Sequence, residues 1–146
     1  MKLSYVKGDL LSTDIKHIVH GCNNRGVMGS GVAKAIRSKY PSAFTDYQDY
    51  FLDGKKPELG SLIFSFQDDD KVIINAITQQ NYGRDPSTVY VSYWAVADAF
   101  RRIEIRGLGK IALPMIGAGL ANGDWNVISA IISNTLVKTQ ATVYIL

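Results

Sequence analysis

The feature that most constrains the fold is an apolar run that passes through glycine and amide residues into a segment with helical spacing. Residues 15–19 are read as a buried strand, the segment from His20 to Ala33 follows directly, and residues 32–40 have the spacing of a helix. Glycine permits a positive φ and a close approach of the backbone to a ligand, and the N–H groups at a helix start favour negative charge. The segment predicts a cradle for a phosphate-containing ligand, although a plain strand-to-helix connection has the same pattern.

The rest of the chain alternates between strand-like and helix-like segments. Apolar or alternating runs predict strands over residues 3–6, 15–20, 61–66, 72–77, 110–114 and 141–146. Apolar spacing predicts helices over residues 29–39, 42–51, 87–105 and 125–137. Asp85-Pro86 is typical of the start of the third helix, and Asp124 of the N-cap of the fourth. We therefore expect a single α/β layered domain over residues 1–146.

Composition excludes several classes of protein. The 146 residues are 47% hydrophobic and 20% charged, which excludes disorder as the main state. The net charge of +3 comes without a lysine and arginine run of the kind that wraps nucleic acid, but a weak positive field favours an anionic ligand. No apolar window has the length of a membrane span, and the first residues do not read as a signal peptide. We expect a cytoplasmic monomer with no membrane partner.

Cysteine and histidine are too few for a structural metal site or a disulfide. Cys22 is the single cysteine, so no disulfide can form within the chain, which suits a reducing compartment. The two histidines, His17 and His20, do not complete a zinc ligand set with it. The sequence predicts neither a metal ion nor a cofactor.

A second glycine-rich segment follows the predicted strand over residues 110–114. In an open α/β sheet, ligands lie outside the carboxyl ends of the strands. The loops over residues 23–32 and 115–120 could therefore hold a diphosphate between them through backbone N–H groups, without a lysine. The chain has no Gly-Lys-Ser/Thr sequence, which excludes a P-loop, and no Gly-x-Gly-x-x-Gly with a following acidic residue, which disfavours a dinucleotide-binding Rossmann unit.

Dispersed motifs resemble a known family, the macrodomains that bind ADP-ribose. The matching segments are YVKGDL at residues 5–10, residues 23–33, PMIGAGL at 114–120 with Asp124-Trp125, and TVYIL at 142–146. They cover nearly the whole chain in the family's order. The resemblance implies a three-layer α/β/α fold with a central mixed sheet. It is strongest to a subgroup that contains glycohydrolases removing ADP-ribose from protein or DNA and a yeast phosphatase of ADP-ribose 1″-phosphate.

The resemblance also implies a role for individual residues. Asp9 and Leu10 would contact the adenine, Asn23 the distal ribose, and Gln80 a phosphate or a ribose. Tyr144 would pack near the adenine, although a core tyrosine is an equal alternative. The two loops would line the diphosphate from opposite sides, through Val27, Gly29, Ser30, Gly31 and Val32 on one side and Ile116, Gly117, Ala118, Gly119 and Leu120 on the other.

Two departures from the family pattern concern catalysis. The glycohydrolases of the subgroup use a lysine just after the strand predicted over residues 72–77, where this chain has Gln79 and Gln80. They also use an aspartate directly after the second loop, where this chain has Ala121. Glutamine can neither form a Schiff base nor act as a charged proton donor. A lysine-dependent release of ADP-ribose is therefore not supported.

The resemblance to the phosphatase includes the pattern His20-x-Cys22-Asn23. Asn23 could orient the distal ribose or a water, and His20 could act as an acid/base or as a donor to the phosphate. The alternative for His20 is a structural hydrogen bond at the strand end. Asp124 is a third catalytic candidate, with an N-cap as its alternative.

We therefore expect an ADP-ribose-binding macrodomain that dephosphorylates ADP-ribose 1″-phosphate, a by-product of tRNA splicing. Two alternatives stay open. One is a non-catalytic reader of ADP-ribose or of ADP-ribosylated macromolecules, and the other is a hydrolase that acts without the family lysine.

Overall fold

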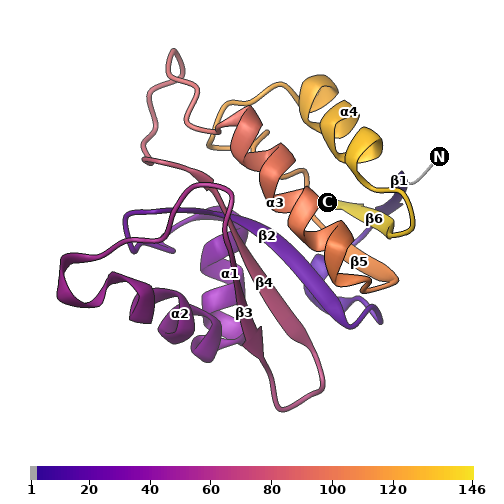
Figure 1. The fold of residues 1–146 in the computed structure, drawn as a ribbon, viewed down its shortest axis with the longest axis horizontal. Helices are drawn as coiled ribbons and strands as arrows, with labels where there is room; N and C mark the ends of the chain where they lie inside the picture. Colours follow the sequence, from indigo (N-terminus) through magenta and orange to yellow (C-terminus); the bar gives the residue numbers. More distant parts are fainter. Residues whose placement is uncertain (1–2) are drawn as a thin grey trace.

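The computed structural model describes residues 3–146 as one mixed sheet with helices on both faces (Figure 1). Residues 1–2 of the expected domain lie outside the described residues. The sheet order is β1-β6-β5-β2-β4-β3, and every neighbouring pair is parallel except β3 and β4. The strands are β1 (Leu3–Lys7), β2 (His17–Asn23), β3 (Leu62–Phe66), β4 (Val72–Gln79), β5 (Lys110–Leu113) and β6 (Gln140–Ile145).

Two helices cover each face of the sheet, which confirms the three-layer arrangement (Figure 1). Alternate residues of a strand point to opposite faces. On β2, Ile18 packs with Ile36 of α1, whereas Val19 packs in the cluster that holds Phe100 of α3. The helices are α1 (Gly31–Lys39) and α2 (Pro41–Gln48) on one face, and α3 (Tyr93–Arg106) and α4 (Trp125–Thr135) on the other.

Helix boundaries differ from the prediction mainly at α3. This helix begins at Tyr93, and its N-cap is Ser92, whose hydroxyl accepts a hydrogen bond from the Ala95 N–H at 3.3 Å. Asp85 instead accepts from the N–H of Ser87 at 2.9 Å, which makes a tight turn. An aspartate before a proline is compatible with both structures, so the sequence pattern did not distinguish them.

The remaining helices follow the sequence pattern more closely. The second helix ends at Gln48 and continues as a 3-10 segment, η2 (Asp49–Gly54), so it does not extend as an α-helix to residue 51. Asp124 is the N-cap of α4, and its Oδ1 accepts from the N–H of Asn126 at 2.9 Å. This N-cap confirms one of the two interpretations of Asp124.

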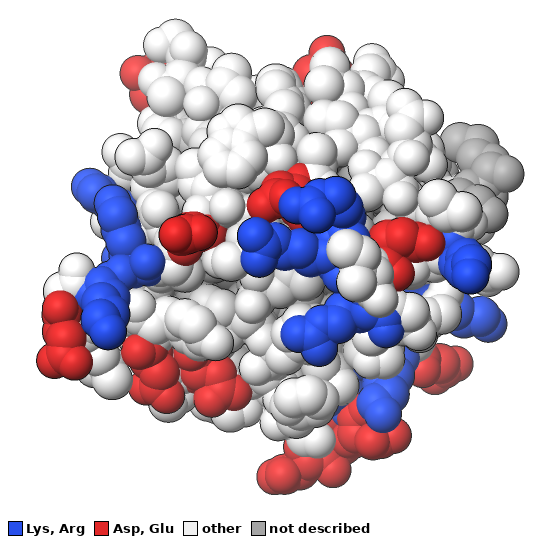
Figure 2. All heavy atoms as spheres, in the orientation of Figure 1, with Lys and Arg blue, Asp and Glu red and all other residues white. Residues whose placement is uncertain are grey.

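Charged residues of both signs are interspersed on the face shown in Figure 2. Lysine and arginine side chains gather near the middle of this face, with aspartate and glutamate among them. On α3, Asp98 pairs with Arg101 and, at 3.4 Å, with Arg102. This face therefore carries mixed charge and no continuous basic track.

No helix within residues 3–146 has the length and apolar character needed to cross a bilayer. The same residues contain no group of three or more histidine, cysteine, aspartate or glutamate side chains placed to hold a metal ion.

Candidate functional site

A cleft of about 780 Å³ opens at the carboxyl ends of β5, β2 and β4. Its volume lies within the range of small-molecule binding sites. Each wall follows one of the three strands. The lining residues are 21–23 and 27–33 at the end of β2 and in the loop after it, 114–117 and 119–121 after β5, and 79 and 82–84 at the end of β4 and in the loop after it. The cleft therefore lies where an open α/β sheet places its ligands.

The loop of the first wall is fixed by Asn23 and by Tyr47 of α2. The Asn23 side chain accepts from the Arg25 N–H at 2.9 Å and donates to the Val27 carbonyl at 3.0 Å. The Tyr47 hydroxyl donates to the carbonyl or Oδ1 of Asn23, at 2.7 and 2.8 Å, and accepts from the Gly26 N–H at 3.0 Å. Burial raises the pKa of Tyr47, so it remains a neutral phenol. These bonds set the shape of the loop before any ligand arrives.

The first wall ends at the N-terminus of α1. Ser30 adopts an extended backbone there but makes no capping hydrogen bond with its side chain. The N–H groups of the first helical residues have no partner within a helix. In α1 these residues are Gly31, which has a φ of 61°, Val32 and Ala33, and all three line the cleft. They form a site with the polarity that an anion requires.

The second wall is a tight turn around Gly117. This residue has a φ of 77°, and a Cβ built on it would lie 2.7 Å from Cγ2 of Val91. Its carbonyl accepts from the Gly123 N–H at 2.6 Å. Within residues 3–146, the N–H groups of Gly117, Gly119 and Leu120 are used in no hydrogen bond. The second wall therefore also has free donors next to the cleft.

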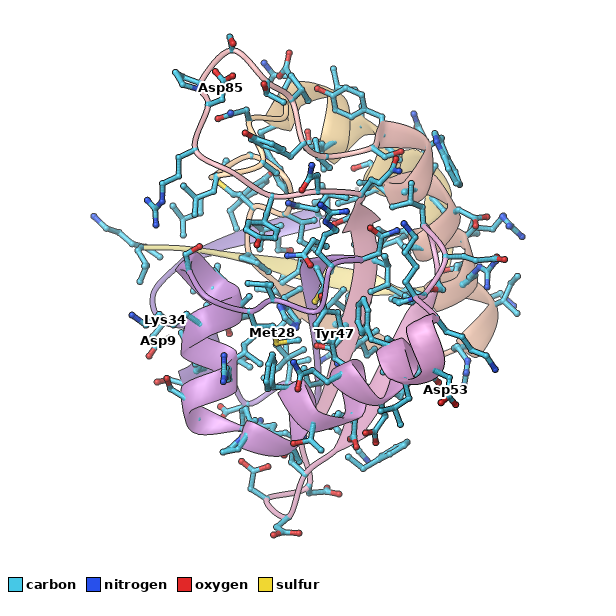
Figure 3. The ribbon with its side chains drawn as sticks, turned by 90° about the vertical axis from the view of Figure 1, so that its left-hand side faces the viewer. Asp9, Met28, Lys34, Tyr47, Asp53 and Asp85 are labelled. Atoms are coloured by element: carbon cyan, nitrogen blue, oxygen red, sulfur yellow. The ribbon has the colours of Figure 1, made fainter. Side chains whose placement is uncertain are left out.

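Of the third wall, the sequence predicted only a phosphate or ribose contact by Gln80. The wall consists of Gln79, the last residue of β4, and of Tyr82, Gly83 and Arg84 in the polar loop between β4 and α3. The three loop residues can be assigned to the site only when the order β5-β2-β4 is known, because that order makes β4 the neighbour of β2. The available signal was the length and polarity of the segment after residue 77. Figure 3 shows Asp85 at the tip of this loop, at the top of the view, and Lys34 of α1 well below it.

Most of the predicted diphosphate contacts are brought together in the cleft. Ala118 and the exposed Gln80 are outside the lining, and Gln79 lines the cleft at the end of β4 instead. The predicted residues that line the cleft are Asn23, Val27, Gly29, Ser30, Gly31, Val32, Ile116, Gly117, Gly119 and Leu120.

The three residues assigned to the adenine lie beyond β5, at the carboxyl ends of β1 and β6, outside the cleft lining. The carboxylate of Asp9 caps a 3-10 turn by accepting from the Leu11 N–H at 3.0 Å. Leu10 is buried beneath this turn. The Tyr144 hydroxyl lies 2.7 Å from Oγ1 of Thr13, and its ring packs against the core. Their contact with adenine stays a prediction.

His20 does not line the cleft, so its expected role as an acid/base or phosphate donor is not supported. The side chain is 1% exposed, and its Nε2 lies 2.5 Å from Oδ1 of Asn75. The Asn75 amide donates to the Ile63 carbonyl at 3.2 Å, so its Oδ1 is the acceptor and His20 Nε2 carries the hydrogen. Burial lowers the pKa of His20 to about 4 and keeps it neutral. His20 therefore makes a structural hydrogen bond in the core, which is the alternative role that the sequence allows for it.

Asp124 is likewise absent from the cleft lining. Its carboxylate is engaged at the start of α4, and its own N–H donates to the Tyr93 hydroxyl at 3.0 Å. The catalytic role expected for Asp124 is therefore not supported.

The described lining contains one charged side chain, that of Arg84, and no carboxylate, lysine or histidine. Gln79 and Ala121, at the positions where the resemblance implies a lysine and an aspartate in the glycohydrolases, both line it. Cys22 also lines it but is 3% exposed, and burial raises the pKa of its thiol. The cleft can thus bind an anion through backbone N–H groups, and it offers little for acid/base catalysis by side chains.

Comparison with known proteins gives consistent matches. The family model described as Macro domain matches residues 19–132. DNA ADP-ribosyl glycohydrolase of Mycobacterium tuberculosis is 31% identical over 126 residues, which are 84% of this chain and 35% of that protein. This chain therefore spans about a third of the length of that relative.

A second relative and a solved structure match over most of their length. ADP-ribose 1″-phosphate phosphatase of Candida albicans is 27% identical over 136 residues, which are 84% of this chain and 86% of that protein. The solved macrodomain of Thermus aquaticus DarG has a TM-score of 0.81 and 25% identity, and the match covers 99% of this chain and 98% of that one.

Proposed function

This chain belongs to the Macro domain family, and on that premise we propose that its cleft binds ADP-ribose and hydrolyses ADP-ribose 1″-phosphate. The observation that carries the proposal is the pair of glycine-rich walls with free backbone N–H groups. A Cβ built on Gly31 would lie 3.9 Å from Cδ1 of Leu120, so the first and second walls approach each other closely. A diphosphate between them would receive N–H donors from both sides.

The choice of a phosphate ester as substrate rests on the lining and on the relatives. Cleavage of a glycosidic bond through a Schiff base needs a lysine, and the described lining has Gln79 and Ala121 where that chemistry would be. The Candida phosphatase matches over 86% of its own length. We propose that water attacks the phosphorus, the bond from phosphorus to the distal ribose oxygen breaks, and that oxygen takes up a proton.

Asn23 has a positioning role in this proposal. Its Nδ2 donates one hydrogen to the Val27 carbonyl and keeps a second one. Asn23 lines the cleft, so this hydrogen is available to the distal ribose or to the attacking water. Because the remainder of the side chain is fixed by Tyr47 and the Arg25 N–H, the donor would be oriented before the ligand binds.

A non-catalytic reader of ADP-ribose is the second candidate function. The described lining favours it, because backbone donors bind a diphosphate without any acid or base. A reader would bind ADP-ribose carried by a macromolecule and release nothing.

Calorimetry with ADP-ribose and an assay of phosphate release from ADP-ribose 1″-phosphate test both candidates. The phosphatase proposal expects a heat of binding and steady release of inorganic phosphate. Binding without release of phosphate from this ester, and without release of ADP-ribose from ADP-ribosylated protein or DNA, would favour the reader. Release of ADP-ribose from those macromolecules would favour the hydrolase that lacks the lysine. If ADP-ribose does not bind, the proposal fails as a whole.

A further inference from the structure

The loop between β4 and α3 is held against the second wall by several hydrogen bonds. Tyr90 donates its N–H to the Ala121 carbonyl at 2.8 Å, and its hydroxyl accepts from the Asp85 N–H at 3.2 Å. The Asn122 side chain donates to the carbonyls of Asp85 at 2.9 Å and Thr88 at 2.8 Å. A Cβ on Gly83 would overlap the Tyr90 hydroxyl, so the backbone beside Arg84 is closely packed. The second and third walls therefore form one connected unit.

Arg84 projects from this unit without an acidic partner. Of the ion pairs in residues 3–146, none includes Arg84, and its guanidinium makes no hydrogen bond there. The neighbouring carboxylate of Asp85 is occupied, because it accepts from the N–H and hydroxyl of Ser87 and from the hydroxyl of Thr88 at 3.1 Å. An arginine that lines a cleft with its donors free is suited to a planar, bidentate contact with a phosphate.

Arg84 belongs to a different wall of the cleft from the diphosphate cradle. The cradle is formed by backbone N–H groups after β2 and β5. Arg84 stands in the loop that begins at β4, on the other side of β2, and that then packs against residues 121 and 122 at the end of the second wall. The resemblance predicts that the adenine lies toward Asp9, at the end of β1, and on that prediction the distal ribose of a bound ligand lies on the β4 side of the sheet. A cation at that end would meet a group attached to the distal ribose.

We propose that Arg84 forms a second anion subsite at the β4 end of the cleft, which selects ADP-ribose derivatives with a phosphate monoester on the distal ribose. This proposal rests on the proposed function, because it uses the orientation of ADP-ribose in the same cleft. Arg84 would contact the ester phosphate with its guanidinium and would leave the diphosphate to the backbone N–H groups. ADP-ribose without the ester would not use this contact.

The test compares Arg84→Gln, Arg84→Lys and Lys34→Gln with the wild type. Lys34 is exposed on α1 beside the cleft and does not line it, so its replacement removes the same unit of charge without removing the subsite. Calorimetry gives the affinity for ADP-ribose. The second readout is kcat/KM for ADP-ribose 1″-phosphate, or the affinity for that ester if the wild type does not turn it over.

Arg84→Gln is expected to keep the ADP-ribose affinity within about twofold and to lower the second readout by about tenfold or more, as loss of a charge-assisted hydrogen bond does. Arg84→Lys should recover part of this loss, and Lys34→Gln should resemble the wild type in both. The proposal is overturned if Arg84→Gln and Lys34→Gln behave alike, or if Arg84→Gln weakens ADP-ribose as much as the ester. Failure of the wild type to bind ADP-ribose would instead contradict the proposed function.

Discussion

The His20 imidazole and the Asn75 amide meet at 2.5 Å inside the layer beneath α1 and α2. Asn75 donates to the Ile63 carbonyl, so its orientation is fixed and its Oδ1 accepts from the Nε2–H of His20. Burial keeps this imidazole neutral. The pair joins β2 to β4, the two strands whose carboxyl ends form the first and third walls. The polar contact therefore supports the cleft from below rather than acting within it.

Stability should fall between about pH 6.5 and pH 4 because of His20. Its pKa is lowered from 6.5 to about 4 in the folded protein by burial, so the unfolded chain binds the proton first as the pH falls. The loss of stability is absent above pH 6.5 and complete near pH 4. It amounts to about 3 kcal/mol in the free energy of unfolding, because a difference of one pKa unit corresponds to 1.36 kcal/mol. Urea unfolding across this range measures it.

The control for this prediction is His20→Asn, which should lose most of the pH dependence in that window. Protonation of Glu104 lowers stability only at lower pH, because hydrogen bonds from the N–H groups of Lys138 and Thr139 lower its pKa from 4.5 to about 2. An NMR titration of the folded protein provides a direct check. A His20 imidazole that titrates near pH 6.5 would contradict the prediction.

Tyr47→Phe should weaken both stability and ligand binding. Without the hydroxyl, the Gly26 N–H and the oxygens of Asn23 lose a buried partner, which costs about 1–3 kcal/mol. The loop of the first wall would then lose its support, so the affinity for ADP-ribose should fall at least severalfold. Urea unfolding and calorimetry measure the two effects.

Tyr40→Phe is the matched control, because the Tyr40 hydroxyl donates to Asp69 at 2.8 Å in the turn between β3 and β4, away from the cleft lining. It should leave the ADP-ribose affinity unchanged. Equal binding by the Tyr47→Phe variant and the wild type would show that the loop keeps its shape without this contact.

The sequence predicted an α/β layered domain and the loops of the first and second walls because these depend on local patterns, whereas of the third wall it predicted only Gln80. Strand and helix periodicity gave the elements, and the two glycine-rich loops follow strands that were recognised. The third wall depends on strand order, which is set by packing over long distances, so Arg84 could not be placed by its neighbours in sequence.

The motif at the strand end leaves His20 between a catalytic and a structural role, although the sequence contains a signal that distinguishes them. In β2, the side chains of Ile18, His20 and Cys22 lie on the same face of the sheet, because they are two residues apart. Ile18 packs on that face beneath α1. A histidine two residues after a core isoleucine points the same way. The pattern of residue types at the strand end favoured a catalytic interpretation, and the period-two alternation would have favoured a buried one.

Gly117→Ala should destabilise the second wall, whereas Gly119→Ala should not. Gly117 has a positive φ, and its Cβ would press on Val91 and, at 3.0 Å, on Ile128. Strain of this kind costs about 1–3 kcal/mol. Gly119 has no positive φ, and its Cβ would meet nothing within 4 Å. Thermal unfolding of both variants measures the difference, and equal melting temperatures would contradict it.

Cys22 should behave as an inert thiol even though its sulfur lies 3.5 Å from His20 Nε2. In a reactive cysteine–histidine pair, the thiolate and the imidazolium stabilise each other. Here burial raises the pKa of the thiol and lowers that of the imidazole, so both groups stay neutral. Iodoacetamide at pH 7.5 should label the unfolded chain quickly and the folded protein only as fast as it opens. Cys22→Ala should retain ADP-ribose binding and any phosphate release that the wild type shows. Rapid labelling of the folded protein, or loss of phosphate release with ADP-ribose affinity intact, would instead identify Cys22 as a nucleophile.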